Sequence, residues 1–255
     1  MNPTEYAIIG VLVALVGILI YEKYTLRAYS EEKKRIEEDI SLSQKYAPKK
    51  ALGMLYVALV NGANGAIFVL LALVLFYAND MGSIRASLSA KYILILGFSV
   101  LIANLSVIPI ATEAMKDIVY FPSVKVPKEI RDIKDMDERT RKEKEFYENE
   151  GIKNGSKNFG KHLILMSMPE TLIIFAFIVF FLISNNGKMT EALAENLFTI
   201  GLVFVLLAAM AIPIMKKAAE IPIEKLPKKL IIAYLAYVPA TVGFVIIIMY
   251  MIMGA

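Results

Sequence analysis

One carboxyl group lies deep inside an otherwise uncharged stretch of this sequence. Glu170 interrupts the run from Leu163 to Gly187 and follows Lys161 by nine residues. At about 1.5 Å per helical residue, Glu170 would lie roughly 13 Å from the charged edge, near mid-bilayer. A charged, unpaired carboxylate is costly there, so Glu170 should hold a proton, bind a cation or face a polar cavity. This position favours proton or ion handling, and a neutral glutamic acid bonded across a helix interface is the structural alternative.

Asn104 is the polar residue best placed to act with Glu170. It lies in the middle of the preceding uncharged stretch, whose helix should pair with the helix of Glu170. Asparagine, serine and threonine commonly form hydrogen bonds between membrane helices. The other polar residues inside uncharged stretches are Asn61, Asn64, Ser99, Ser106, Ser167, Thr171 and Thr241. Glu113 and His162 lie at stretch ends, where we expect interfacial side chains; His162 could alternatively relay protons.

The elements that position these residues should be membrane-spanning helices. Of the 255 residues 57% are hydrophobic and 20% are charged, so the two kinds must be segregated along the chain. Six stretches carry no charge apart from Glu170: Tyr6–Tyr21, Ala51–Asn79, Tyr92–Thr112, Leu163–Gly187, Asn196–Met215 and Leu230–Ala255. A spanning helix needs about 20 such residues, and only the first stretch is shorter. The sequence predicts an all-α integral membrane protein with six transmembrane helices, and it excludes a soluble enzyme.

The basic residues are concentrated in alternate loops. Eight of the 28 lysines and arginines lie within residues 23–50, twelve within 116–161 and five within 216–229; the other loops hold only Arg85, Lys91 and Lys188. An excess of basic residues marks cytoplasmic loops. The three charged loops should therefore face the cytoplasm, and both termini should face outside. The N-terminus lacks the basic segment of a signal peptide, so we expect the first span to be retained.

Composition excludes several kinds of site. The chain has no cysteine and one histidine, so thiolate, iron–sulfur, multi-histidine and haem sites are excluded. Phosphate-binding, dinucleotide-binding and nucleophile-elbow motifs are missing from the sequence. We therefore expect no catalytic residue, metal or cofactor. The net charge of +4 comes from basic residues that lie in the loops expected on the cytoplasmic side. This distribution is explained by membrane topology and does not favour a nucleic-acid partner.

The odd-numbered spans share a repeated pattern. Gly97 precedes Pro109 by twelve residues and Gly201 precedes Pro213 by twelve, at a constant offset of 104. Each proline lies within Ile-Pro-Ile, and we expect it to kink its helix because it removes a backbone hydrogen bond. Gly10 begins the first span in the same way.

The even-numbered spans share a second pattern, which completes a threefold repeat. Residues 169–171 (Pro-Glu-Thr) match residues 239–241 (Pro-Ala-Thr), and residues 62–64 (Gly-Ala-Asn) occupy the corresponding place. The sequence thus predicts three tandem helical hairpins: residues 1–78, residues 79–187 with a long charged cytoplasmic loop over 113–161, and residues 188–255. Hairpins in the same orientation should pack with odd helices adjacent to odd helices.

The long loop should contain a short helix. Pro127 stands at a plausible start, and Ile130, Ile133 and Met136 follow at helical spacing within the charged segment Lys128–Glu150. This helix would either lie back on the protein or dock a cytoplasmic partner.

The segment Lys161–Ile183 resembles the outer helix of the proteolipid subunit (K or c) of V/A-type ATP synthases. That family shows Lys-Ala-Leu-Ile, a short apolar stretch, Leu-Pro-Glu-Thr and an aromatic–aliphatic run; this chain has Lys-His-Leu-Ile, Leu-Met-Ser, Met-Pro-Glu-Thr and Leu172–Ile183. The resemblance implies tandem hairpins, with Glu170 as the ion-carrying carboxylate and Thr171 as an oxygen donor beside it. Together with Asn104 they form the expected ion-binding group.

The chain differs from that family in several respects. Its odd spans hold only one or two glycines each, and Ala63 and Ala240 replace the carboxylate in two of three hairpins. Leu172 stands where sodium-specific members carry glutamine. The chain therefore resembles a divergent three-hairpin member of the family.

The expected function is that of a membrane-embedded, proteolipid-like subunit that takes part in H⁺ or Na⁺ translocation and is not itself an enzyme. It would be a multi-pass protein of the cell membrane, with lipid and other membrane and cytoplasmic subunits of a multi-subunit complex as partners. One alternative is a structural or accessory subunit, or an assembly factor, of an energy-converting complex. Another is a small secondary transporter, which requires discontinuous helices and several polar groups that converge at mid-membrane.

Overall fold

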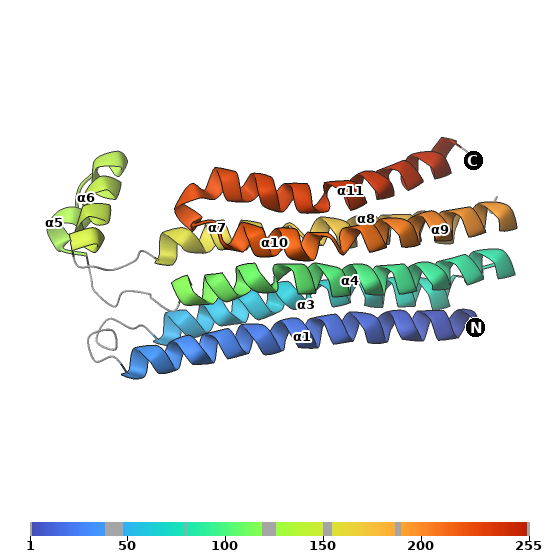
Figure 1. Ribbon diagram of the computed structural model, residues 1–255, viewed down its shortest axis with the longest axis horizontal. Coiled ribbons are helices and arrows are strands. Elements are labelled where there is room, and N and C mark those ends of the chain that lie inside the picture. The colour runs from blue at the N-terminus through green and yellow to red at the C-terminus, as the bar shows by residue number, and fades with distance from the viewer. Residues whose placement is uncertain are drawn as a thin grey trace.

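The computed structural model describes residues 2–38, 48–79, 81–118, 126–149, 155–186 and 190–253, and every regular element in these ranges is a helix. The long elements form an elongated bundle (Figure 1). The helices are α1 (Pro3–Glu38), α3 (Pro48–Ala78), α4 (Ser83–Ile118), α5 (Lys128–Arg131), α6 (Met136–Asn149), α7 (Gly155–Ser167), α8 (Glu170–Asn185), α9 (Glu191–Ala208), α10 (Ala211–Ala219), the 3₁₀ helix η1 (Ile223–Lys225) and α11 (Leu226–Met253).

The predicted all-helical class with six potential spans is confirmed. Six segments of the described chain are long and apolar enough to cross a membrane: Pro3–Glu38, Leu55–Ala78, Ser83–Lys116, Gly160–Asn185, Glu191–Ala219 and Ile223–Ile252. Large apolar side chains are exposed along the outer faces of α1, α3, α9 and α11. An apolar exterior over this length is what a lipid environment requires, so the fold is that of a multi-pass membrane protein.

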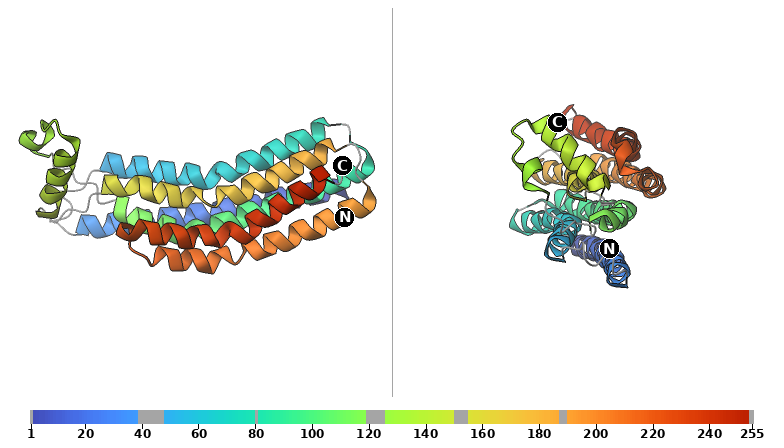
Figure 2. Two further views of the ribbon diagram at one scale, coloured as in Figure 1. Left: turned by 90° about the horizontal axis from the view of Figure 1, so that it is seen from above. Right: turned by 90° about the vertical axis from the view of Figure 1, so that its left-hand side faces the viewer.

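The helix α4 lies at the centre of the bundle. It packs against α1 on one side and against α9 and α10 on the other, and it also contacts α3, α7 and α8. Of its most apolar window 67% is buried, whereas no other span exceeds 44%. The odd-numbered spans thus form one row, and α3, α8 and α11 pack in that order along a second row. The end-on view of Figure 2 shows this arrangement.

Contacts within the odd row differ between its two interfaces. A Cβ atom on Gly97 would lie 2.1 Å from the carbonyl oxygen of Gly10, so α1 and α4 touch through their backbones. Gly201 of α9 instead faces Tyr92 of α4, and the Tyr92 hydroxyl donates a hydrogen bond to the carbonyl of Leu197 at 2.7 Å. Close glycine packing therefore holds α1 on α4, whereas a buried tyrosine holds α9 on α4.

Two of the potential spans have an interrupted helical hydrogen-bond pattern, although the backbone at Pro169, Ala209 and Met210 stays in the right-handed helical region. The fourth consists of α7 and α8, separated at residues 168–169, and the fifth consists of α9 and α10, separated at residues 209–210. Proline cannot donate the backbone hydrogen bond that a continuous helix needs. In a continuous helix the amide at position 213 would donate to the carbonyl of Ala209, but proline has no N–H. The amide of Ile212 donates to that carbonyl instead, at 3.1 Å.

The remaining intramembrane prolines do not interrupt their helices. The helix α4 continues through Pro109, and α11 continues through Pro239. The shared Ile-Pro-Ile motif therefore interrupts the helix at Pro213 but not at Pro109.

The charged segment after α4 forms two helices, not the single helix expected from its apolar spacing. Pro127 precedes α5 as expected, but the chain leaves that helix after Arg131. The side chain of Asp135 accepts hydrogen bonds from the amides of Asp137 and Glu138 at 2.9 and 3.2 Å, which caps a new helix, α6. The two helices pack on each other and lie beyond one end of the bundle (Figures 1 and 2).

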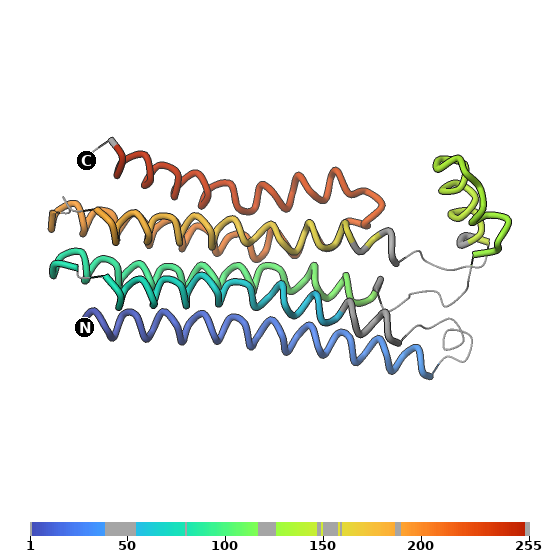
Figure 3. Tube along the Cα trace, turned by 180° about the vertical axis from the view of Figure 1, so that it is seen from behind, coloured from blue at the N-terminus to red at the C-terminus, as the bar shows by residue number. Residues whose placement is uncertain are grey.

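Both chain ends lie at the end of the bundle opposite to α5 and α6, as Figure 3 shows from behind. At the end nearer to α5 and α6, the ammonium group of Lys229 in α11 donates to the carboxylate of Glu113 in α4 and to the carbonyl of Ile221. The Lys229 side chain is fully buried. This ion pair ties the sixth span to the third.

Candidate functional site

The interruption of the fourth span places Glu170 at the start of a helix. The chain turns at Met168 and Pro169, and Glu170 is the first residue of α8. The amide of Thr171 donates to the carbonyl of Met168 at 3.3 Å, which closes this turn. The backbone of Pro169 stays in the right-handed helical region (φ −62°, ψ −21°), and the amide of Leu172 donates to the Pro169 carbonyl at 3.1 Å. The turn is therefore a local tightening of the span beside Glu170.

An amide from a neighbouring span contacts the carboxyl group directly. Asn64 of α3 donates through Nδ2 to Oε1 of Glu170 at 3.0 Å. Both side chains are partly buried between the packed helices α3 and α8. A hydrogen bond to a charged acceptor is stronger than one to a neutral acceptor. Because an asparagine amide can turn to present its oxygen, Asn64 can accept from Glu170 once the acid is protonated.

A small cavity adjoins Glu170 between α3, α4 and the α7–α8 junction. Its volume is about 10 Å³, close to the minimum that a single water molecule needs. Asn104 lines it from α4 and is 4% exposed, and its Nδ2 has no hydrogen-bond partner within the described part of the chain. The lining residues are Asn61, Gly62, Gly65, Ala103, Asn104, Val107, Met166, Pro169, Glu170 and Ile173. The structure thus brings Glu170 and Asn104 to one cavity.

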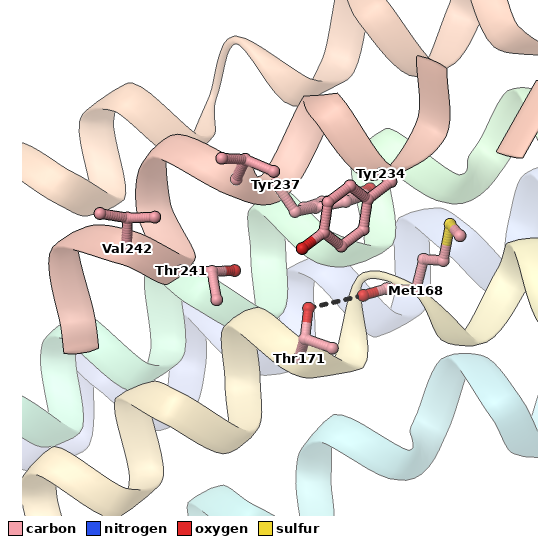
Figure 4. A pocket seen from close by; sticks show the side chains of 7 residues that line it. Met168, Thr171, Tyr234, Tyr237, Thr241 and Val242 are labelled. Atoms are coloured by element: carbon pink, nitrogen blue, oxygen red, sulfur yellow. Dashed lines mark hydrogen bonds between the residues drawn. The ribbon is translucent and has the colours of Figure 1, made fainter. Parts of the chain in front are cut away.

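Thr171 lies on a different face of the helix. Its hydroxyl donates to the carbonyl of Met168 at 2.8 Å, and its side chain lines a separate pocket of about 110 Å³ between α8 and α11 (Figure 4). The facing hydroxyl-bearing residues are Thr241, Tyr234 and Tyr237 of α11. Consecutive helical residues point about 100° apart, so the neighbour of Glu170 in sequence does not share its cavity.

The positions that the predicted repeat aligns with Glu170 carry no carboxyl group. They are Ala63 of α3 and Ala240 of α11, and Ala240 is fully buried. Asn64, which the predicted repeat aligns with Thr171, contacts Glu170 from the second potential span. The interface between α3 and α8 is therefore carboxyl-bearing, whereas that between α8 and α11 is lined by hydroxyl and apolar groups.

Sequence reasoning placed Asn61 and Asn64 only among general helix-bonding residues. Asn61 donates through Nδ2 to the carbonyl of Met166 at 3.2 Å. The two asparagines are three residues apart and so share one face of α3. This spacing was a usable signal in the sequence, but the helix that the face contacts became evident only from the packing. The buried ion pair of Lys229 with Glu113 was also not predicted.

This geometry can hold one exchangeable proton or one very small ion. In the described ranges no group of three or more histidine, cysteine, aspartate and glutamate residues is arranged to hold a metal ion. The side-chain groups around the carboxyl are amides, whose N–H donors stabilise its ionised form and whose oxygens accept from its protonated form. The amides can thus form hydrogen bonds with either form of the carboxyl group.

Fold and site together define a multi-span helical membrane protein with one carboxyl group in a small polar cavity between packed helices. Comparison with protein-family models, with curated proteins and with solved structures finds no match.

Proposed function

We propose that this chain is a membrane-embedded, proteolipid-like subunit whose Glu170 binds and releases a proton during ion translocation. The observation that carries the proposal is the hydrogen bond from Asn64 to Glu170 beside the cavity lined by Asn104. An intramembrane ionisable residue that faces a cavity, and not lipid, is a functional residue by default. The two rows of packed helices support three side-by-side hairpins, with the site between the first two.

The donor set favours a proton over a sodium ion. Hard cations are held by several oxygen ligands, such as carboxylates, carbonyls and hydroxyls. Asn64 presents Nδ2 to the carboxyl, and the Thr171 hydroxyl lies in the other pocket. In this proposal the charged loops and α5–α6 face the cytoplasm, both termini face outside, and the chain resides in the cell membrane with partner subunits.

A hydrophobic carbodiimide tests the proposal because it reacts with protonated carboxyl groups in apolar surroundings. Intact protein in membranes should acquire one adduct near neutral pH, and peptide mapping should assign it to Glu170. The variant Glu170→Gln should acquire none. Protection by added Na⁺ would indicate a sodium site, and labelling confined to surface carboxylates would contradict the proposal.

A structural or accessory subunit is the second candidate, and α5–α6 favours it. These helices lie beyond the end of the bundle, and α6 carries charges of both signs in pairs such as Arg139 with Glu143 at 2.9 Å. Such a projecting element could dock a soluble subunit. This candidate predicts that removal of residues 128–149 abolishes association with cytoplasmic subunits, whereas Glu170→Gln has no effect.

The interruption at residues 168–169, which adjoins the cavity beside Glu170, favours a third candidate, a small secondary transporter. Discontinuous helices that meet at a polar cavity are typical of such proteins. Reconstitution of the purified chain alone into proteoliposomes distinguishes the candidates, since only a transporter would move its substrate without partner subunits.

A further inference from the structure

The polypeptide break beside Glu170 is held from a neighbouring span. In a continuous helix the carbonyl of Leu165 would accept from the amide of residue 169, and Pro169 has no N–H to donate. Here α7 ends at Ser167, and the Met166 carbonyl accepts from the side chain of Asn61 at 3.2 Å. The Met166 carbonyl is adjacent in sequence to the Leu165 carbonyl, from which Pro169 withholds the helical donor. Asn61 therefore holds the backbone of α7 next to the interruption.

The same face of α3 holds the start of the next helix. Asn64 lies one turn after Asn61 and bonds the Glu170 side chain at the first position of α8. Two amides of one helix thus hold both sides of the break, one through a backbone carbonyl and one through the carboxyl group. The relative placement of α7 and α8 at this point depends on α3.

Glycines fix the distance over which these amides act. A Cβ on Gly62 would lie 2.0 Å from the ring of Tyr21, and one on Gly65 would lie 2.9 Å from Val100 and 3.2 Å from Ile173. The helix α3 is consequently seated close against α1, α4 and α8. A helix held this closely cannot shift to restore a lost amide contact, so each amide has a defined role.

We propose that Asn61 is a positioning residue for Glu170, which it acts on through the Met166 carbonyl by fixing the break that Pro169 introduces. This inference rests on the proposed role of Glu170. It assigns a role to Asn61, which does not itself contact the proton. Asn61 lines the cavity, but its donor group is engaged with the backbone of α7. The effect of Asn61 on the reactivity of Glu170 should therefore depend on the interruption at Met168 and Pro169.

A double-mutant cycle with Pro169 tests this dependence. Asn61→Leu removes the amide and keeps the number of side-chain heavy atoms, and Pro169→Ala restores the backbone N–H that the Leu165 carbonyl would accept from in a continuous helix. We expect Asn61→Leu to change the rate of carbodiimide modification of Glu170 by about tenfold in the native background and by less than about twofold in Pro169→Ala. Val60→Ala, at an outward-facing neighbour on α3 that is 44% exposed, should leave the rate unchanged.

The outcomes separate the possible roles of Asn61. Thermal unfolding of each variant establishes that it is folded before its labelling rate is compared. Equal effects of Asn61→Leu in both backgrounds would overturn the positioning role, because a direct ligand acts whether or not the helix is broken. No effect in either background would also overturn it. Failure of wild-type Glu170 to react would instead refute the proposed function, so the two failures are distinguishable.

Discussion

At the residue scale, the site combines one carboxyl group with three asparagines that do different things. Asn64 bonds the carboxyl, Asn61 bonds the backbone of the preceding helix, and Asn104 offers a buried amide to the cavity. A buried polar group without a partner destabilises a fold, because it loses its hydrogen bonds to water. The orientation of Asn104 is therefore better explained by what it offers Glu170 than by stability.

Asn104→Leu tests this explanation. Leucine has the same number of side-chain heavy atoms but is bulkier, and the removal of an unpaired amide offsets part of the overpacking, so the free energy of unfolding should stay within about 2 kcal/mol of wild type. Carbodiimide modification of Glu170 should nevertheless change, because the cavity loses its polar wall. Thermal unfolding and peptide mapping measure the two effects. Strong destabilisation with unaltered modification would show that Asn104 is structural.

The buried pair of Lys229 and Glu113 provides a second test at this scale. Lys229→Met removes the cation and leaves Glu113 without it, so unfolding should become easier by about 3 kcal/mol. The adjacent Lys228 is exposed, and Lys228→Met is the matched control, expected to have little effect. The additional change Glu113→Gln should recover much of the loss. Chemical unfolding in detergent measures all variants, and equal stability of the two methionine variants would contradict the account.

At the element scale, the uncharged stretches predicted six long apolar helices because only such segments satisfy their backbone within lipid. The effect of each proline was harder to predict. Pro213 follows an interruption and Pro109 does not, although both lie in Ile-Pro-Ile. The local motif is the same, so the difference arises from packing around each helix, which the sequence does not specify.

The candidate site could likewise be predicted only in part, because helix packing decides which side chains meet. Glu170 could be singled out from the sequence because its charge contradicts its surroundings, and Asn104 because it lies mid-span in the helix expected to pair with that of Glu170. Thr171 was expected beside Glu170, but the helix turns its side chain toward α11. Asn61 could not be assigned, because its role depends on a neighbouring break that only the folded bundle positions.

Glycine packing gives the prediction that belongs to this scale. A methyl group at Gly97 would overlap the backbone of Gly10, so Gly97→Ala should force α1 and α4 apart and destabilise the bundle by about 2 kcal/mol. Gly82 is the control, since a Cβ there would meet nothing within 4 Å. The free energy of unfolding in detergent checks both variants. If Gly97→Ala is as stable as Gly82→Ala, the close approach of α1 and α4 is wrong.

At the scale of the whole molecule, the bundle has a charged end near α5 and α6 and an end that holds both termini. The distribution of lysine and arginine predicts that the charged end is cytoplasmic. Because the chain has no cysteine, single introduced cysteines report their location without background.

Cysteines at exposed positions should therefore separate into two groups. Thr140→Cys and Lys217→Cys should react only with membrane-permeant reagents in intact cells, whereas Ser83→Cys and Ala192→Cys should also react with impermeant ones. Mass spectrometry of the labelled protein gives the result. Impermeant labelling at Thr140 would reverse the orientation and place α5 and α6 outside.

The most direct test of the central claim compares proton movement in membranes that contain wild-type protein, Glu170→Asp or Glu170→Gln. Glutamine preserves the size and hydrogen bonding of the side chain but cannot release a proton, so Glu170→Gln should leave the protein folded and assembled with its partners while proton movement is lost. Aspartate should retain part of the activity, because the carboxyl remains but is displaced from Asn64. A fully active Glu170→Gln variant would contradict the account and leave Glu170 a structural residue.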